Sequence, residues 1–456
     1  MKEKNDMSRR KFLTTVSTAA AAVAGAQFLG PLSQAETVYV PKGGKLALLG
    51  GKPVAPNKVW PAWPYVDEKI VARVSDTVRS GKWCRIDVKN GNVAQFEKAF
   101  AELIGAKGCV CTGSGTQSLH TVVEAMGFGP GDEIITSPYT DMGTIQGILA
   151  ARALPVLADI EKDSFQIDPE DVERKITPHT VAIMPVHIMG QPCNMQRIME
   201  IAKKHNLRVI EDACQAHLAE YQGRRIGTIG DAGCFSFQSS KVICCGEGGG
   251  IISNDERLLD DCYTVQNHGT NKQGRSVTIG PKYRMNELEA SILLGQIEHT
   301  REQNTIRNRN AQHLYKRFEG FKGLVPQRLY EGTTNGSFYL YTWSFRDEYW
   351  DGVTRNQFLK AMAAEGIGLS PYIKNGLHKE PWTDNIVRRK SYQAMYSPGR
   401  LMQFKEELGK PNCDWVCDHM VMLWASGPLL GTIKDMDDVA DAVMKVYENR
   451  KELAKI

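Results

Sequence analysis

Between residues 105 and 237, short apolar runs alternate with stretches whose apolar residues recur every three or four positions. The first pattern is typical of strands buried on both faces, and the second is typical of helices that cover a sheet. Strands are predicted at CVCT (109–112), DEIITSP (132–138), TVAIMPV (180–186), RVIED (208–212) and AGCFSF (232–237), and helices at 116–127, 144–152 and 195–205. We therefore expect an α/β fold with a mainly parallel sheet covered by helices.

The pattern changes after Tyr283. One long helix is predicted over 285–320, followed by a strand at 339–345, a helix at 354–366 that begins after Thr354, and a last helix at 436–453. We expect a large domain over 36–304, including an N-terminal segment, and a smaller α+β domain over 305–456. The stretch 371–412 is rich in Pro, Lys and Trp and gives no clear prediction.

The first 35 residues have a different composition. Ser8-Arg9-Arg10-Lys11-Phe12-Leu13 precedes a weakly apolar Ala/Val/Thr stretch that ends in Ser33-Gln34-Ala35. This order of basic, apolar and small residues predicts a twin-arginine signal, and the alternative is a short amphipathic helix. The signal implies the twin-arginine export machinery as a partner and a periplasmic or other extracytoplasmic location. Because that machinery moves folded proteins, a cofactor would be loaded before export.

Composition narrows the remaining classes. The 456 residues carry a formal net charge of +4, too little to favour nucleic acid as a partner, and no apolar run after the signal is long enough to span a membrane. The eleven cysteines lack the spacing of a metal site. We expect buried free thiols and no metal.

Three predicted strand ends carry groups with chemical potential. TGSGTQSL (112–119) begins a helix whose N-terminus would favour binding of phosphate. The same residues are also compatible with an ordinary strand-to-helix turn that binds no ligand. Glu211-Asp212 ends the strand RVI, where a carboxylate is often only a helix cap. Lys241 follows AGCFSF among small and apolar residues, and burial there would make its amine a nucleophile. Taken singly, a surface lysine is the commoner case.

Together, the three ends meet the requirements of pyridoxal phosphate. That cofactor needs a lysine for its covalent link, an anionic partner for its pyridine nitrogen and an anchor for its phosphate. Asp212 and Lys241 are separated by enough chain for one further strand. We therefore predict that they lie at opposite ends of one cofactor ring, at the carboxyl edge of the sheet.

Longer motifs carry a resemblance to a known family. TGSGTQSL, GPGDEIITSPYT, VIEDACQAH, GCFSFQSSKVICCGEGGGIISND and YRMNELEAS occur in this order. The chain resembles the DegT/DnrJ/EryC1/StrS aminotransferases over nearly its whole length after the signal. The resemblance implies the aspartate-aminotransferase-like fold (pyridoxal-phosphate fold type I) and a homodimer with shared active sites.

The resemblance also implies roles for particular residues. Lys241 matches the lysine that binds the cofactor covalently, Asp212 the partner of the pyridine nitrogen, and Gln215 the side chain that hydrogen-bonds the phenolic oxygen. The residues that match phosphate ligands are Gly115, Thr116 and Ser236.

Two positions depart from the family pattern. Asp141, in SPYTD, stands where the family has the aromatic residue that stacks on the pyridine ring, and Tyr139 is a candidate replacement. Lys282 stands where an asparagine reaches the neighbouring subunit's phosphate, and a lysine can still neutralise phosphate. Arg284 and His268 are weaker candidates for contact with substrate.

The implied activity is transfer of an amino group from glutamate or glutamine to a keto-sugar or keto-cyclitol. Lys241 would act both in the covalent link and in proton transfer. Two alternatives remain. Asp141 is compatible with a protein that binds the cofactor or an amino-sugar without turnover. Related enzymes that dehydrate sugars carry histidine in place of the lysine, so Lys241 favours amination over dehydration.

Overall fold

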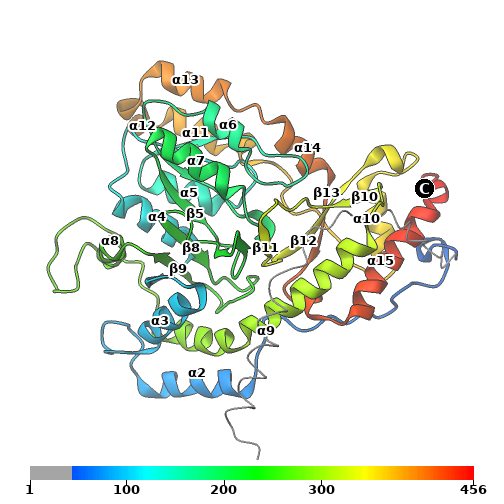
Figure 1. Cartoon of the computed structure of the whole chain (residues 1–456), viewed down its shortest axis with the longest axis horizontal. Helices are drawn as coiled ribbons and strands as arrows, with labels where there is room; N and C mark the ends of the chain where they lie inside the picture. The colour runs from blue at the N-terminus through cyan, green and yellow to red at the C-terminus, as the bar shows by residue number, and fades with distance from the viewer. Residues whose placement is uncertain (1–43) are drawn as a thin grey trace, which may run out of the picture. The chain divides into compact units, whose positions relative to one another are not determined.

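The computed structural model describes residues 44–456. The predicted export signal lies outside this range, so it stays a prediction. The core is a seven-stranded sheet (Figure 1). Its strands, in spatial order, are β1 (Gly108–Thr112), β9 (Gly249–Ser253), β8 (Ala232–Ser236), β5 (Arg208–Asp212), β4 (Thr180–Met184), β2 (Glu133–Thr136) and β3 (Leu154–Leu157).

The direction of the strands confirms a mainly parallel sheet. β3, β2, β4, β5 and β8 run parallel to one another, whereas β9 pairs antiparallel with both β8 and β1. The five predicted strands are all present. The sequence analysis missed β3, whose run LPVL is short and contains a proline, and β9, whose run GGIIS begins with two glycines. Both features weaken a strand signal.

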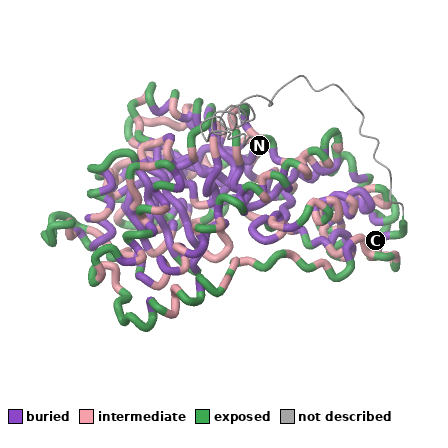
Figure 2. The backbone as a smooth tube through the Cα atoms, turned by 60° about the horizontal axis from the view of Figure 1, so that its bottom comes forward, coloured by how far each residue is buried: buried purple, intermediate pink, exposed green. Residues whose placement is uncertain are grey.

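Each face of the sheet is covered by its own hydrophobic cluster, and the strands form the most buried part of the chain (Figure 2). One cluster includes α3 (Asn92–Ile104), α7 (Met195–His205) and the first turns of α9 (Glu287–Arg317). The other includes α4 (Gly115–Ala125), α5 (Met142–Ala150) and α8 (Glu256–Gln266). Burial on both faces explains why the strands consist mainly of successive apolar residues.

Helix α9 continues from the large sheet to a second, antiparallel sheet of β10 (Leu324–Pro326), β12 (Leu340–Phe345) and β13 (Met420–Trp424). The helices α10 (Arg355–Ala364) and α15 (Ile433–Glu448) pack with it around a separate hydrophobic cluster. Thr354 caps α10 as predicted. The predicted domain boundary falls inside α9, and its position remains a prediction. A third sheet joins β11 (Thr333–Asn335), β6 (Glu220–Tyr221) and β7 (Arg224–Arg225).

The stretch 371–412, which gave no clear prediction, contains the short helices α11 (Trp382–Arg388), α12 (Lys390–Met395) and α13 (Pro398–Glu406), and α14 (Pro411–His419) begins at its end. They cover the β3 edge of the large sheet. The Tyr392 hydroxyl donates to the Ala153 carbonyl over 3.1 Å, and Arg400 pairs with the buried Glu133. These long-range contacts hold helices that are too short to be stable alone.

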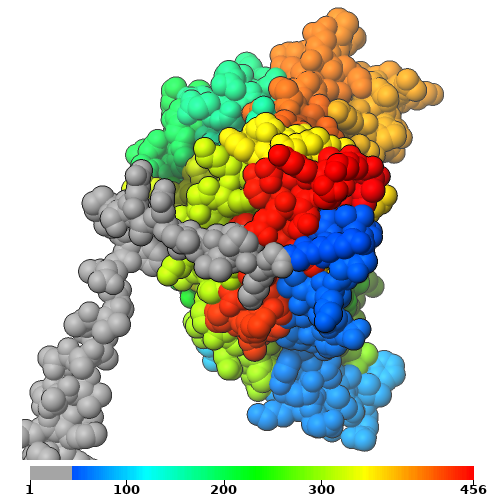
Figure 3. All heavy atoms as spheres, turned by 90° about the vertical axis from the view of Figure 1, so that its right-hand side faces the viewer, coloured from blue at the N-terminus to red at the C-terminus, as the bar shows by residue number. Residues whose placement is uncertain are grey.

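The first described residues pack on the C-terminal helix α15 (Figure 3). The fully buried Glu365 carboxylate accepts the backbone N–H groups of Ala47 and Val54 at 2.9 and 3.0 Å. It also pairs with Lys445 Nζ at 2.7 Å. Within residues 44–456, no helix is both long enough and apolar enough to cross a bilayer.

Candidate active site

A cavity of about 390 Å³ lies at the carboxyl ends of β5 and β8. Ligands of open parallel sheets gather at this edge. Seven of the predicted site residues line the cavity: Gly115, Thr116, Asp141, Asp212, Gln215, Ser236 and Lys241. They come from strand ends and helix starts that are far apart in the sequence, and the parallel sheet brings them together.

Asp212 is the last residue of β5, and its side chain is almost fully buried. Its carboxylate accepts a hydrogen bond from Thr144 Oγ1 at 2.7 Å and from the backbone N–H of Cys214 at 3.2 Å. The preceding Glu211 has the opposite environment, because successive strand residues face opposite sides. It accepts three backbone N–H groups, from Gly227, Ile229 and Gly230, and its contacts are therefore structural.

Lys241 follows β8 in an irregular segment and is half-buried. Its Nζ lies 4.3 Å from the centroid of the Tyr339 ring, which is a cation–π contact. Within residues 44–456, Lys241 forms no salt bridge. The amine therefore faces an aromatic ring and the cavity, where it can react.

The backbone at Lys241 is held by parts of the chain from both sides. Trp63 Nε1 donates to the Lys241 carbonyl at 3.1 Å, and Ser426 Oγ donates to the Ser240 carbonyl at 2.6 Å. The buried Arg307 donates to the Ser426 carbonyl at 2.9 Å and stacks on Trp63 at 4.9 Å. Burial lowers the pKa of Arg307 to about 9. These contacts fix the direction in which the Lys241 side chain leaves the backbone.

The other end of the cavity is the N-terminus of α4. Ser114 caps the helix by accepting the Gln117 N–H at 3.2 Å, and Gly115 and Thr116 begin it. A Cβ on Gly115 would come within 2.8 Å of both Cys214 Sγ and Ser236 Cβ. Only glycine fits this close approach, which leaves backbone N–H groups and hydroxyls open to an anion.

Gln215 lies between the sheet edge and the smaller sheet. Its Oε1 accepts the Met189 N–H at 2.8 Å, and its Nε2 donates to the Tyr372 hydroxyl at 3.1 Å. The orientation of the amide is thereby fixed, with the nitrogen directed to the cavity side. Burial raises the pKa of Tyr372, with smaller contributions from Tyr339 and Asp141, so this hydroxyl stays protonated.

Four predicted residues do not line this cavity. Tyr139 is fully buried in a core cluster with Phe165 and does not line the cavity, so its role as a replacement for the stacking aromatic stays a prediction. Lys282 and His268 are exposed on one surface segment, and Arg284 donates to Asn267 at 3.0 Å. Within this single chain, none of these three side chains reaches the cavity.

Sequence reasoning missed other residues that line the cavity, among them Thr144, Cys214, Glu247, Tyr339 and Tyr372. Thr144 and Cys214 had a usable signal, because each lies within three residues of a predicted site residue. Tyr339 begins a run that was interpreted only as a strand. Tyr372 lies in the stretch that gave no prediction. Their role depends on the smaller sheet approaching the larger one, which no local pattern encodes.

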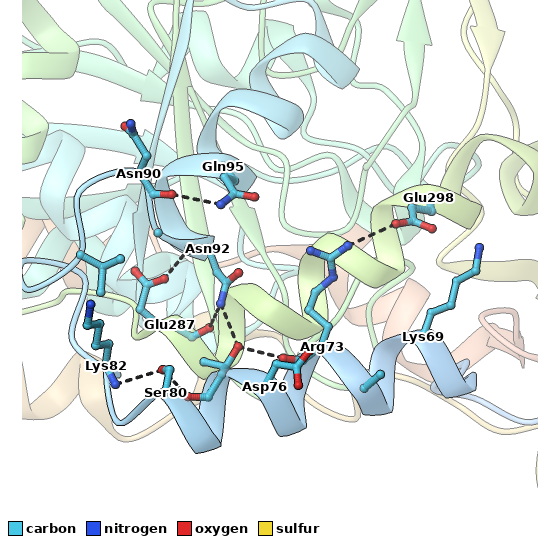
Figure 4. Close-up of a pocket in the computed structure, with 14 residues that line it drawn as sticks. Lys69, Arg73, Asp76, Ser80, Lys82, Asn90, Asn92, Gln95, Glu287 and Glu298 are labelled. Carbon is cyan, nitrogen blue, oxygen red and sulfur yellow. Dashed lines mark hydrogen bonds and ion pairs between the residues drawn. The ribbon is translucent and has the colours of Figure 1, made fainter.

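A larger hollow of about 730 Å³ lies between α2 (Glu68–Ser80), α3 and the start of α9 (Figure 4). Its polar groups largely satisfy one another. Asn92 Nδ2 donates to Thr77 Oγ1 at 3.0 Å, and Arg73 pairs with Glu298 at 3.6 Å. None of the predicted site residues lines it. We therefore assign the chemistry to the smaller cavity.

The residues present fit pyridoxal phosphate. Asp212 offers a buried carboxylate for the pyridine nitrogen. Lys241 offers an amine without an acidic partner for the covalent link. The N-terminus of α4 at Gly115 offers a site for the phosphate. Together, the mainly parallel sheet and this cavity define the class: a pyridoxal-phosphate enzyme of the aspartate-aminotransferase-like fold.

The chain belongs to the DegT/DnrJ/EryC1/StrS aminotransferase family, which residues 64–400 match. It is 31% identical over 429 residues to the L-glutamine:scyllo-inosose aminotransferase of Streptomyces griseus, covering 90% of this chain and 99% of that protein. It is 34% identical over 417 residues to a Streptoalloteichus tenebrarius protein provisionally named an L-glutamine:3-amino-2,3-dideoxy-scyllo-inosose aminotransferase, covering 89% and 98%.

Solved structures agree on the fold. The aminotransferase from Psychrobacter cryohalolentis superposes with a TM-score of 0.74 at 25% identity, over 86% of this chain and all of that one. The 3-amino-5-hydroxybenzoic acid synthase gives a TM-score of 0.73 at 24% identity, over 86% and 99%. The protein is thus a pyridoxal-phosphate-dependent aminotransferase.

Proposed function

We propose that the protein transfers the amino group of glutamine, or of glutamate, to the ketone of a cyclitol or sugar ring. The observation that carries the proposal is the shared cavity of Lys241 and Asp212. The names of the similar proteins support glutamine as donor and a keto-cyclitol as acceptor. The similar proteins are named aminotransferases, which favours amino transfer over the two alternatives, binding without turnover and sugar dehydration.

The roles of the side chains follow from their positions. When bound, pyridoxal phosphate supplies an electron sink for the bonds at the amino-bearing carbon. Asp212 would keep the pyridine nitrogen protonated through a charge-assisted hydrogen bond. Among the described residues, Lys241 Nζ is the only amine that lines the cavity, so it holds and moves the proton as amine and ketone exchange. The Tyr339 ring lies beside this nitrogen, 4.3 Å from its centroid to Nζ.

Borohydride reduction tests the assignment of the lysine. The purified protein should be yellow, lose that absorbance on reduction, and carry the cofactor on Lys241 in a peptide map. Lys241→Arg keeps the charge but should lose both the absorbance and the label. A label on another lysine would refute the assignment.

Half-reactions with a panel of amino donors test the activity itself. Release of a keto acid excludes a protein that only binds its ligands. A deoxy-sugar product formed without amine transfer would instead support dehydration.

We also propose a homodimer in which Lys282 reaches the phosphate end of the partner's cavity. Exposed large apolar side chains occur on α2 and the segment after it (Val71, Val78, Trp83 and Ile86) and in the segment just before Lys282 (Val277 and Ile279). Ile279 is 93% exposed in the single chain, which is unusual for a large apolar residue.

Mixing two inactive variants tests this arrangement. A dimer of one Lys241→Ala subunit and one Lys282→Ala subunit has one cavity with both lysines only if Lys282 acts across the interface. We expect activity to return on mixing. Absence of recovery, with subunit exchange shown by labelled chains, would place Lys282 in its own cavity or outside both.

Finally, we propose export by the twin-arginine machinery, on the basis of residues 1–35. An epitope-tagged chain should appear in the extracytoplasmic fraction of cells, whereas a variant with Arg9 and Arg10 both replaced by Lys should remain inside. Retention of both forms in the cytoplasm would contradict the proposal.

A further inference from the structure

A second hollow lies between the end of α5 and the short helices α11 and α12 (Figure 1). Its volume is about 320 Å³, which is at the lower end of the range of small-molecule sites. It shares no lining residue with the catalytic cavity. The polar side chains of its lining include Gln146, Arg152, Asn385, Arg389 and Ser391. The hollow is therefore a separate candidate site.

The charge of this hollow is entirely positive. Arg152 and Arg389 line it, and none of its lining residues is acidic. Among residues 44–456, neither guanidinium forms a salt bridge or donates a side-chain hydrogen bond. Burial raises the pKa of the Tyr392 hydroxyl to about 12, and the charges of Arg389 and Arg152 both oppose this rise. The two guanidinium groups therefore lie near one hydroxyl at the wall of the hollow.

Tertiary contacts keep the two arginines on this hollow. Arg152 directly follows α5, and Arg389 is the residue between α11 and α12. Tyr392 of α12 joins the two segments, because its hydroxyl donates to the carbonyl of Ala153 at 3.1 Å. Two like charges thus stay at the same hollow although they repel each other. An anion bound between them would turn this repulsion into attraction.

The backbone of Arg152 gives an independent argument. Its φ of 68° lies in the left-handed region, where glycine is the usual residue after a helix. A side chain at this position is a source of backbone strain, and strained positions are concentrated at functional sites. An arginine that is strained, exposed and without an acidic partner is explained if its guanidinium binds a ligand.

We propose that this hollow binds the phosphate monoester of a small hydroxylated molecule, that is, a sugar phosphate or polyol phosphate. Arg152 and Arg389 donate charge-assisted hydrogen bonds to the phosphate oxygens. The side chains of Gln146, Asn385 and Ser391 offer donors and acceptors for the hydroxyl groups. The inference goes beyond the proposed function and does not depend on it, because no residue of this hollow lines the catalytic cavity.

Calorimetry on the cofactor-loaded and borohydride-reduced protein compares glucose 6-phosphate with glucose. Reduction keeps the cofactor in the catalytic cavity, so the phosphate end of that cavity is closed to the probe. We expect glucose 6-phosphate to bind and glucose not to bind. Arg389→Gln should weaken binding by about 10- to 100-fold, the usual effect of losing a hydrogen bond to a charged group. Arg388→Gln is the matched control, because Arg388 is the preceding exposed residue and does not line the hollow.

The variant Arg152→Gly separates a loss of binding from a loss of folding. Glycine suits the left-handed backbone, so urea unfolding should show a stability at least equal to that of the wild type. Binding of glucose 6-phosphate should still weaken by about 10- to 100-fold. Absence of binding to the wild type, or binding that survives both Arg152→Gly and Arg389→Gln, would overturn the inference.

Inorganic phosphate tests the part of the inference that concerns the hydroxyl groups. It should bind more weakly than glucose 6-phosphate, because it makes no contact with the amides of Gln146 and Asn385. Equal affinity for the two probes would overturn the assignment to a sugar or polyol phosphate. Equal affinity for glucose and glucose 6-phosphate would overturn the role of both arginines.

Discussion

His217 offers a prediction that links burial to pH. The side chain is fully buried beside the rings of Phe100, Phe235 and Phe237, and neither ring nitrogen has a hydrogen-bond partner. Burial lowers its pKa from 6.5 to about 3, and the charge of Lys241 contributes in the same direction. We consider the variant His217→Phe, which keeps an aromatic ring but cannot bind a proton.

The sign and the size follow from proton linkage. Between pH 6.5 and about 3, the unfolded chain binds a proton at His217 and the folded chain does not. Stability conferred by the neutral imidazole is therefore complete above pH 6.5 and falls as the pH falls. The value of pH 5 lies about 1.5 pH units below the pKa of the unfolded state, and each of these units corresponds to about 1.4 kcal/mol. The wild type should thus lose about 2 kcal/mol from this group between pH 7 and pH 5.

Urea unfolding at pH 5, 6 and 7 measures this loss as a difference between wild type and variant. The free energy of unfolding of His217→Phe should fall by about 2 kcal/mol less than that of the wild type. His217→Leu serves as the control, because it changes packing but should show the same pH dependence as His217→Phe. Curves for wild type and both variants that stay parallel within about 0.5 kcal/mol would refute the reasoning.

Other predictions concern the cavity and the C-terminal packing. Asp212→Asn should lower kcat by about 10- to 100-fold, because the pyridine nitrogen loses its anionic partner, and unchanged turnover would contradict that role. Gly115→Ala should weaken cofactor binding in a spectroscopic titration. Its Cβ would lie 2.8 Å from Cys214 Sγ and Ser236 Cβ, which should cost about 1–3 kcal/mol of stability. An unaltered titration would show that the phosphate binds elsewhere. Glu365→Gln should destabilise the fold by about 3 kcal/mol in urea unfolding, because it leaves the Lys445 ammonium buried without a counter-charge. A loss below about 1 kcal/mol would show that the ammonium reaches water.

The sequence alone determined the main layer of the fold and the position of the chemistry. Runs such as RVIED and AGCFSF contain buried apolar residues at successive positions, which is typical of strands covered on both faces. Because parallel strands end at one edge, Asp212 at the end of β5 and Lys241 after β8 were expected to lie near each other, and both line the cavity. Local order in the sequence was sufficient for this much.

Only the tertiary structure decided which other side chains join them. Tyr339 and Tyr372 reach the cavity because α9 brings the smaller sheet against the larger one, and Tyr139, close in sequence to Asp141, points into the core instead. Such contacts depend on packing between segments more than 150 residues apart, as in the hydrogen bond between Gln215 and Tyr372. The periodicity of apolar residues indicates which face of a helix or strand is buried. Which other segment packs against that face depends on shape and close packing across the whole chain.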